Sequence, residues 1–266
     1  MNSLSLKFIK LSLVAFIATL STNTFAAGGF TWIGSLVDAL HIPVPDYTIT
    51  FLLIGLVIVI VGLVYQAKVK ASSNAVVPDK GITIRNIIEL YGNFIRKQCK
   101  EVIGEEHADT YFPFVATIFI FIFVSNFIGL IPGFLPPTEY LNTALALGVF
   151  SFVYYNIKGV KEQGLVKYVA HFAGPLWYLA FLIFPIEIIS NFIRPVSLAL
   201  RLRSNMMGDH IVLTKFSEMV PLGVPIIFMV LGLLVSFIQA YVFTVLSMVY
   251  INLAISHHDH DEEHAH

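Results

Sequence analysis

Ionisable and polar side chains recur at regular intervals inside the otherwise apolar stretch 185–210. An ionised side chain at mid-membrane costs from about 3 to more than 10 kcal/mol, so each charge there requires a reason. Intervals of three and four residues keep side chains on one face of a helix. The polar members at these intervals are Glu187, Ser190, Arg194, Ser197, Arg201 and Ser204/Asn205. We interpret them as a polar seam on an apolar helix, a route for protons or small ions centred on Arg201.

Three other interpretations of the same residues remain open. Arg201 and Arg203 could be a basic cluster at a helix end, with side chains that reach the cytoplasmic headgroups. End-anchoring does not explain why the polar positions continue upstream to Glu187. Arg201 could instead bind an anionic substrate in a secondary transporter, although such transporters often contain internal repeats and none is visible here. In a membrane scaffold, the charges would only set topology.

The composition is that of a polytopic membrane protein. Of the 266 residues, 57% are hydrophobic and 12% charged, and the mean hydropathy is +0.80. This excludes an ordinary soluble globular domain. Cys99 is the only cysteine, so the chain cannot form an internal disulfide or a thiolate metal site of its own. No Gly-rich phosphate loop, CxxC pair or HExxH motif occurs, and we expect neither cofactor nor resident metal.

Residues 1–26 have the pattern of a signal peptide. Lys7 and Lys10 precede an apolar centre, and Thr24-Phe25-Ala26 resembles a small-residue cleavage site. The alternative is a short N-terminal membrane segment that is retained. Cleavage would leave 27–266 as a single polytopic membrane domain, with its N-terminus in the periplasm and its C-terminus in the cytoplasm.

The remaining apolar stretches predict an all-α fold with about five transmembrane helices. Lys and Arg follow alternate spans, which by the positive-inside rule assigns those ends to the cytoplasm. The predicted spans are 48–66, 111–132, 140–156, 169–202 and 224–256.

The last two spans are too long for perpendicular crossings. Residues 224–256 alone would extend about 48 Å as a helix, against a hydrocarbon core of about 30 Å. We therefore expect two long, strongly tilted helices, paired as a hairpin and joined by an outer loop at about 206–223. Gln239, near the middle of the last helix, is expected to face the Arg201 seam because an unpaired buried amide is costly.

Polar segments outside these spans predict three further features. Apolar residues at helical intervals in 84–101 indicate an amphipathic helix on the cytoplasmic membrane surface, which either docks a partner or merely connects two spans. Asn126 is the one strongly polar residue inside the span 111–132, and it is expected to make a structural hydrogen bond to a neighbouring helix. The His-, Asp- and Glu-rich tail 257–266 is expected to be a solvated cytoplasmic end rather than a metal site.

The motif RPVSLALRLRSNM, with the later segment FIQAYVFTVLSMVYINLA, resembles subunit a of bacterial F-type ATP synthases. The resemblance extends over nearly the whole chain and includes the span PFVATIFIFIFVSNFIGLIPG. It implies a proton-translocating stator subunit in the bacterial cell inner membrane, without a catalytic site of its own. Its implied partners are the ring of c subunits, the b subunits of the peripheral stalk and the rest of the synthase complex.

The resemblance also implies roles for particular residues. Arg201 corresponds to the family's essential arginine, which faces the carboxylates of the c ring. Two aqueous half-channels are implied beside it, neither of which crosses the membrane alone. The implied residues are Asn205, His210 and Gln239 for the outer half-channel, and Glu187, Ser190 and Ser197 for the inner one.

Three positions depart from the usual pattern of the family. Arg203 replaces an aromatic residue, and Gly129 replaces an acid that some bacterial relatives carry. Gly232 stands where relatives with Glu at position 210 tend to carry His, so His210 is expected to act without that pairing. The sequence leaves open whether the ion is a proton or sodium, because the ion-binding carboxylate belongs to subunit c.

Overall fold

The computed structural model describes residues 31–39, 41, 44–71, 81, 83–131, 133–164, 168, 180–219 and 223–255. Within these ranges the chain is entirely helical, which confirms the predicted all-α class. The elements are α2 (Trp32–Ala39), α3 (Asp46–Ala71), α4 (Ile84–Ile103), α5 (Glu105–Ile128), the 3-10 helix η1 (Pro137–Glu139), α6 (Leu141–Gln163), α8 (Ala180–Met219) and α9 (Val224–Ile255).

Five of these helices, α3, α5, α6, α8 and α9, are long and apolar enough to cross a membrane, as predicted. The 40 residues of α8 and the 32 of α9 correspond to about 60 Å and 48 Å of helix. Both lengths greatly exceed a hydrocarbon core of about 30 Å. Either helix must therefore lie strongly inclined if its apolar length is to remain within a bilayer.

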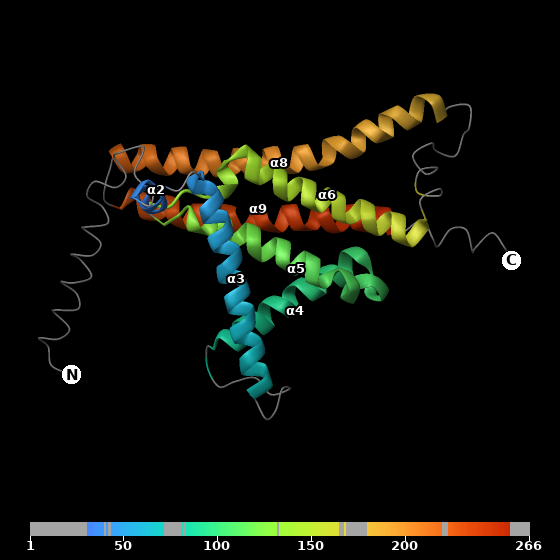
Figure 1. Cartoon of the computed structure of the whole chain (residues 1–266), viewed down its shortest axis with the longest axis horizontal. Coiled ribbons are helices and arrows are strands. Elements are labelled where there is room, and N and C mark those ends of the chain that lie inside the picture. The colour runs from blue at the N-terminus through green and yellow to red at the C-terminus, as the bar shows by residue number, and fades with distance from the viewer. Residues whose placement is uncertain are drawn as a thin grey trace, which may run out of the picture.

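The helices α8 and α9 form the predicted hairpin and run side by side along the longest axis of the molecule (Figure 1). The predicted loop at 206–223, however, is mostly wrong, because α8 continues to Met219. Gly208 lies within the predicted loop, yet a glycine costs a helix only about 1 kcal/mol. Met206 and Leu213 on either side are buried, and their packing holds the helix together.

A central core joins α8 and α9 to α5 and α6. Gly148 of α6 lies so close to α8 that an added Cβ would be 2.6 Å from the carbonyl oxygen of Pro195. A hydrogen bond of 2.9 Å joins the buried hydroxyls of Ser151 and Ser247 between α6 and α9. The first contact holds α8 against α6 over the part that contains the polar seam, and the second holds α6 against α9.

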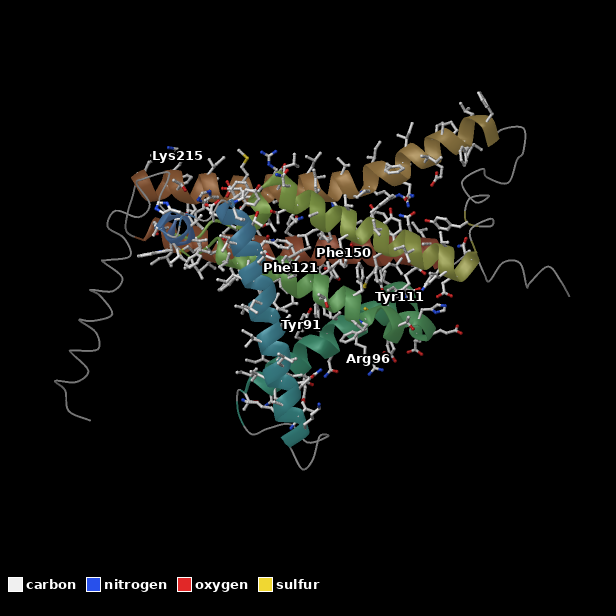
Figure 2. All side chains as sticks on the ribbon, in the orientation of Figure 1. Tyr91, Arg96, Tyr111, Phe121, Phe150 and Lys215 are labelled. Carbon is white, nitrogen blue, oxygen red and sulfur yellow. The ribbon has the colours of Figure 1, made fainter. Side chains whose placement is uncertain are left out.

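The amphipathic helix expected at 84–101 is α4, which begins at the N-cap Thr83 and ends at the C-cap Gly104. Tyr91 and Arg96 lie along it next to α5 (Figure 2), and the Tyr91 hydroxyl donates a 2.5 Å hydrogen bond to the Ala116 carbonyl. The sequence placed Arg85 on the polar face, but it is 1% exposed, with its Nε 2.7 Å from Glu89 Oε1. This ion pair offsets the cost of burying the charge.

The short helix α2 was not predicted. It is tied to the loop after α5 by a 3.0 Å hydrogen bond from the Trp32 amide to the Gly133 carbonyl. The predicted signal peptide 1–26 and the tail 257–266 both lie outside the described residues.

Cys99 provides a simple test of how α4 packs. Its side chain is fully buried, and burial raises the pKa of the thiol to about 11. The thiolate is the nucleophile, so the native protein should incorporate no N-ethylmaleimide at pH 7.5, as measured by intact mass. The variant Lys97→Cys, whose parent side chain is 75% exposed, should gain one label under the same conditions. Labelling of Cys99 at the rate of that control would contradict the packing of α4.

Candidate functional site

Arg201 lies on the exposed face of α8, within an apolar membrane-spanning segment. Its guanidinium makes no ion pair or hydrogen bond with any described residue. Its exposed neighbours on this face include the small residues Ser197, Ser204 and Gly208. The arrangement leaves a permanent positive charge available to a group from outside this chain.

Packing on the opposite side of α8 holds Arg201 in this position. Leu198, Ala199, Leu202 and Met206 are at most 3% exposed and belong to the central core. Since these residues fix the rotation of the helix, Arg201 cannot turn inward without breaking the core. The charge faces outward because its neighbours face inward.

Asn205, one turn after Arg201, joins α8 to α9. Its amide Nδ2 donates a 2.5 Å hydrogen bond to Oε1 of Gln239, which is 3% exposed. The structure thus confirms the expectation that Gln239 faces the polar seam of α8. The pair supplies neutral donors and acceptors one turn beyond the guanidinium.

His210 lies beside the 3-10 helix η1. Its Nδ1 is 3.3 Å from Oε2 of Glu139, close enough for an ion pair when the imidazole is protonated. Glu139 was not among the predicted site residues, because it lies 71 residues before His210 in a loop with no evident partner. The two side chains are 33% and 22% exposed, so they remain partly accessible to water.

The loop that carries Glu139 is fixed to α5 through Asn126. The buried Oδ1 of this residue accepts a 2.7 Å hydrogen bond from the Thr138 hydroxyl. This confirms the structural role predicted for Asn126, with η1 as its partner.

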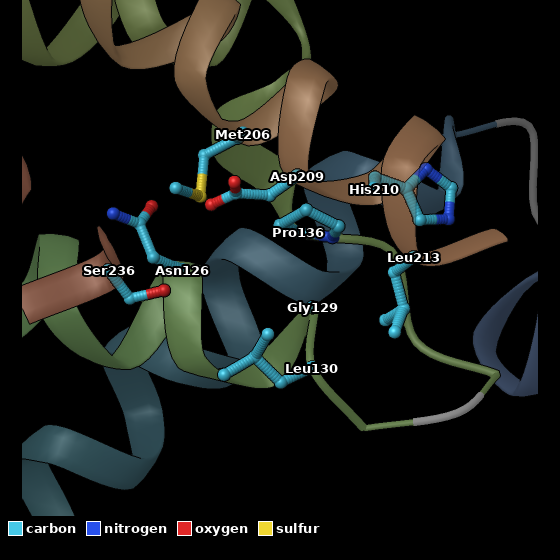
Figure 3. Close-up of a pocket in the computed structure, with 9 residues that line it drawn as sticks. All are labelled: Asn126, Gly129, Leu130, Pro136, Met206, Asp209, His210, Leu213 and Ser236. Carbon is cyan, nitrogen blue, oxygen red and sulfur yellow. The ribbon is translucent and has the colours of Figure 1, made fainter. Parts of the chain in front are cut away.

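A cavity of about 20 Å³ lies next to His210 and is lined by α5, α8, α9 and the loop before η1 (Figure 3). Asp209 lines it, and Oδ2 of this carboxylate is buried without a hydrogen-bond partner. Asp209 was not among the predicted site residues, although it is next to His210 in the sequence.

A second polar cluster lies toward the other end of α8. Glu187 Oε1 is 3.5 Å from an Arg194 guanidinium nitrogen, and the guanidinium carbon lies 5.2 Å from the centre of the Tyr250 ring. Asn191 accepts a 2.8 Å hydrogen bond from the Tyr155 hydroxyl of α6. The pairing of Arg194 with Glu187 follows from their spacing of two helical turns, but the contribution of α6 had no signal in the sequence.

The two predicted serines do not join this network. Ser190 is half-buried and Ser197 exposed, and neither forms a hydrogen bond with another described residue. Arg203 is half-buried, and its Nε is buried without a hydrogen-bond partner. Among the described residues no group of three or more His, Cys, Asp or Glu could hold a metal ion.

The polar groups of α8 therefore form two clusters, one on each side of Arg201. Along the helix axis, Glu187 lies about 21 Å before Arg201 and His210 about 14 Å after it. The intervening buried residues of α8 are mainly apolar. Arg201, whose guanidinium has no partner among the described residues, lies between the two clusters along the helix.

Comparison with known proteins identifies the family. Residues 47–252 match the family model described as ATP synthase A chain. The chain belongs to the ATP synthase A chain family.

Curated relatives agree with this assignment. The chain is 48% identical to ATP synthase subunit a of Bdellovibrio bacteriovorus over 200 residues, which are 75% of this chain and 86% of the relative. It is 39% identical to ATP synthase subunit a of Sulfurimonas denitrificans over 211 residues, which are 79% of this chain and 93% of the relative. A third relative, ATP synthase subunit a 2 of Syntrophotalea carbinolica, is 49% identical over 63% of this chain and 71% of its own length.

The Asn205–Gln239 contact can be tested by replacing each side chain in turn. Asn205→Leu should leave the buried Gln239 amide without its partner and destabilise the protein by about 1–3 kcal/mol. The double variant Asn205→Leu/Gln239→Leu removes both polar groups, so it should be more stable than either single variant. Thermal unfolding in detergent measures this order, and purely additive losses would contradict a direct contact.

Proposed function

We propose that this chain is the proton-translocating stator subunit of a bacterial F-type ATP synthase, with two offset half-channels that meet at Arg201. Membership of the ATP synthase A chain family supports the assignment to the membrane sector. The observation that carries the mechanism is the unpaired guanidinium of Arg201, exposed on an apolar membrane helix between two separate polar clusters.

The outer half-channel comprises His210, Asn205 and Gln239, and it opens to the periplasm. His210 and its neighbour Glu139 form the water-accessible mouth. An imidazole exchanges protons near neutral pH, because the reference pKa of histidine is about 6.5. The Asn205–Gln239 pair then offers hydrogen-bonding groups one turn from Arg201.

The inner half-channel comprises Glu187, Ser190 and Ser197 and leads to the cytoplasm. Glu187 is 38% exposed, so protons can reach its carboxylate from water. The two serines contribute hydroxyls on the way to Arg201. No continuous polar route past Arg201 is required, because the proton makes the intervening step on a carboxylate of the c ring.

Arg201 separates the two half-channels electrostatically. Its fixed charge repels a proton that would otherwise pass directly between them. The same charge favours the ionised form of a ring carboxylate that approaches, so that the carboxylate releases its proton inward and reloads from the outer side. The membrane potential drives this cycle with about 2.3 kcal/mol per charge per 100 mV.

The proposed function requires partners within the synthase complex. The face of α8 around Arg201 contacts the c ring, whose close approach is permitted by the small side chains Ser197, Ser204 and Gly208. The b subunits of the peripheral stalk hold the chain against the rotation of that ring. The complex resides in the bacterial inner membrane.

Replacing Arg201 tests the central step. Arg201→Ala should abolish ATP-driven proton pumping in inverted membrane vesicles and permit passive leak, because no charge remains to separate the half-channels. Arg201→Lys should also fail, since a lysine lacks the planar, delocalised guanidinium. Arg96→Ala, which removes an exposed guanidinium from α4, should retain pumping. Wild-type pumping by Arg201→Ala would refute the mechanism.

Removing the imidazole tests the outer half-channel. His210→Ala should slow proton entry and change the pH profile of proton uptake between about pH 5.5 and 7.5, where an imidazole titrates. The matched variant His107→Ala removes an exposed imidazole from α5 and should leave rate and profile unchanged. Uptake by His210→Ala that equals the wild type in rate and profile would exclude His210 from the pathway.

A further inference from the structure

We propose that the Asp209 carboxyl is a proton-carrying group of the outer half-channel, acting at a hydration site that it shares with Asn126 and Ser236. The inference rests on the proposed function above and adds a residue and a water site to it. It starts from the small cavity beside His210, which contains polar groups that the mechanism has not used.

Asp209 differs from an ordinary surface acid. Its Oδ2 is buried and accepts no hydrogen bond from any described residue. A carboxylate in this state lacks the donors that would stabilise its charge, and that loss is expensive in an apolar surrounding. Either a water molecule donates to it or it carries a proton itself.

The cavity offers space for such a water molecule beside polar groups that lack hydrogen-bond partners. Its volume of about 20 Å³ exceeds the roughly 10–15 Å³ needed to hold one. Asn126 also lines it, is 1% exposed and has an amide Nδ2 without a partner, while the Ser236 hydroxyl is contributed by α9. A water molecule there would accept a hydrogen bond from Asn126 and donate one to Asp209.

Asp209 lies on α8 between two parts of the proposed outer half-channel, His210 and the Asn205–Gln239 pair. Figure 3 shows the Asp209 carboxylate and the His210 imidazole leaving α8 in opposite directions, the former toward Asn126 and Ser236. Asp209 is also one turn after Asn205, so both side chains lie along one side of the helix about 6 Å apart in rise. The carboxyl thus lies between the mouth at His210 and the Asn205–Gln239 pair.

The proposed transfer is balanced and reversible. A proton leaves a hydronium at the mouth beside His210 and forms an O–H bond on Asp209, and a water molecule remains. That bond then breaks as the proton passes through the water molecule and past Asn205 to an ionised carboxylate of the c ring, and the Asp209 carboxylate is regenerated. No oxidation or reduction takes place.

Other charged and titratable groups belong to the elements around Asp209. Along α8 these are Arg203 and His210, and η1 contributes Glu139 beside the imidazole. Asn126 of α5 and Ser236 of α9 are the neutral polar side chains that line the cavity. The pH dependence of proton flow therefore reports on Asp209, His210 and Glu139 together, and a change at Asp209 alters it.

The test measures passive proton uptake, driven by a potassium diffusion potential, into vesicles that contain the complete membrane sector with its catalytic head removed. Asp209→Asn keeps the shape of the side chain but cannot carry the proton, so conductance should fall about tenfold or more and its pH profile should change. Asp209→Glu restores a carboxyl and should recover much of the loss. Asp109→Asn, the same substitution at an exposed site, should behave as the wild type.

Conductance by Asp209→Asn within twofold of the wild type, with an unchanged pH profile, would overturn the inference. If Asp209→Asn does not assemble with the ring, Ser236→Ala decides the question, because it removes only a hydroxyl from the cavity. Reduced conductance with an altered pH profile then supports the hydration site, and wild-type behaviour refutes it. The Arg201→Ala experiment distinguishes failure of the proposed function from failure of this inference. Normal pumping by Arg201→Ala refutes the proposed function. Wild-type proton conductance by Asp209→Asn refutes only the inference about Asp209.

Discussion

The unpaired charge of Arg201 is the constraint on which the rest of the molecule depends. A guanidinium in an apolar helix is expensive, and here no described residue neutralises it. It keeps its place because the opposite side of α8 is closely packed: Gly148 allows α6 to approach, and Leu198 and Leu202 are buried in the core. The free energy of that packing holds the helix in a rotation that an isolated segment in lipid would avoid.

The same packing divides the polar groups into two clusters with different chemistry. The Glu187 end combines an ion pair with aromatic hydroxyls and amides, whereas the His210 end combines an imidazole with two carboxylates. Each cluster includes side chains from helices other than α8, so the polar seam of α8 does not form either cluster by itself. In the proposed mechanism this division obliges an ion to leave the chain and travel on the rotor.

Much of this structure could be predicted from the sequence, because the length of apolar stretches and the spacing of charges at helical intervals indicate membrane helices. The five spans, the hairpin and the Gln239 contact follow from those signals. The prediction failed where tertiary packing overrode local cues: the expected outer loop at 206–223 is helical as far as Met219, because Met206 and Leu213 are buried. Glu139 and Tyr155 reach the site through long-range contacts that no spacing in the sequence reveals.

The two prolines of α8 have a consequence for the backbone as well. A proline has no N–H, so the carbonyls of Phe181 and Asn191, four residues before Pro185 and Pro195, lack a donor within the helix. In hydrocarbon such a carbonyl requires another donor or water. The Asn191 carbonyl belongs to the same residue that binds the Tyr155 hydroxyl through its side chain. The main-chain carbonyl at position 191 therefore attracts water in addition to the polar side chains nearby. This effect does not depend on which side chain occupies position 191, because it arises from Pro195.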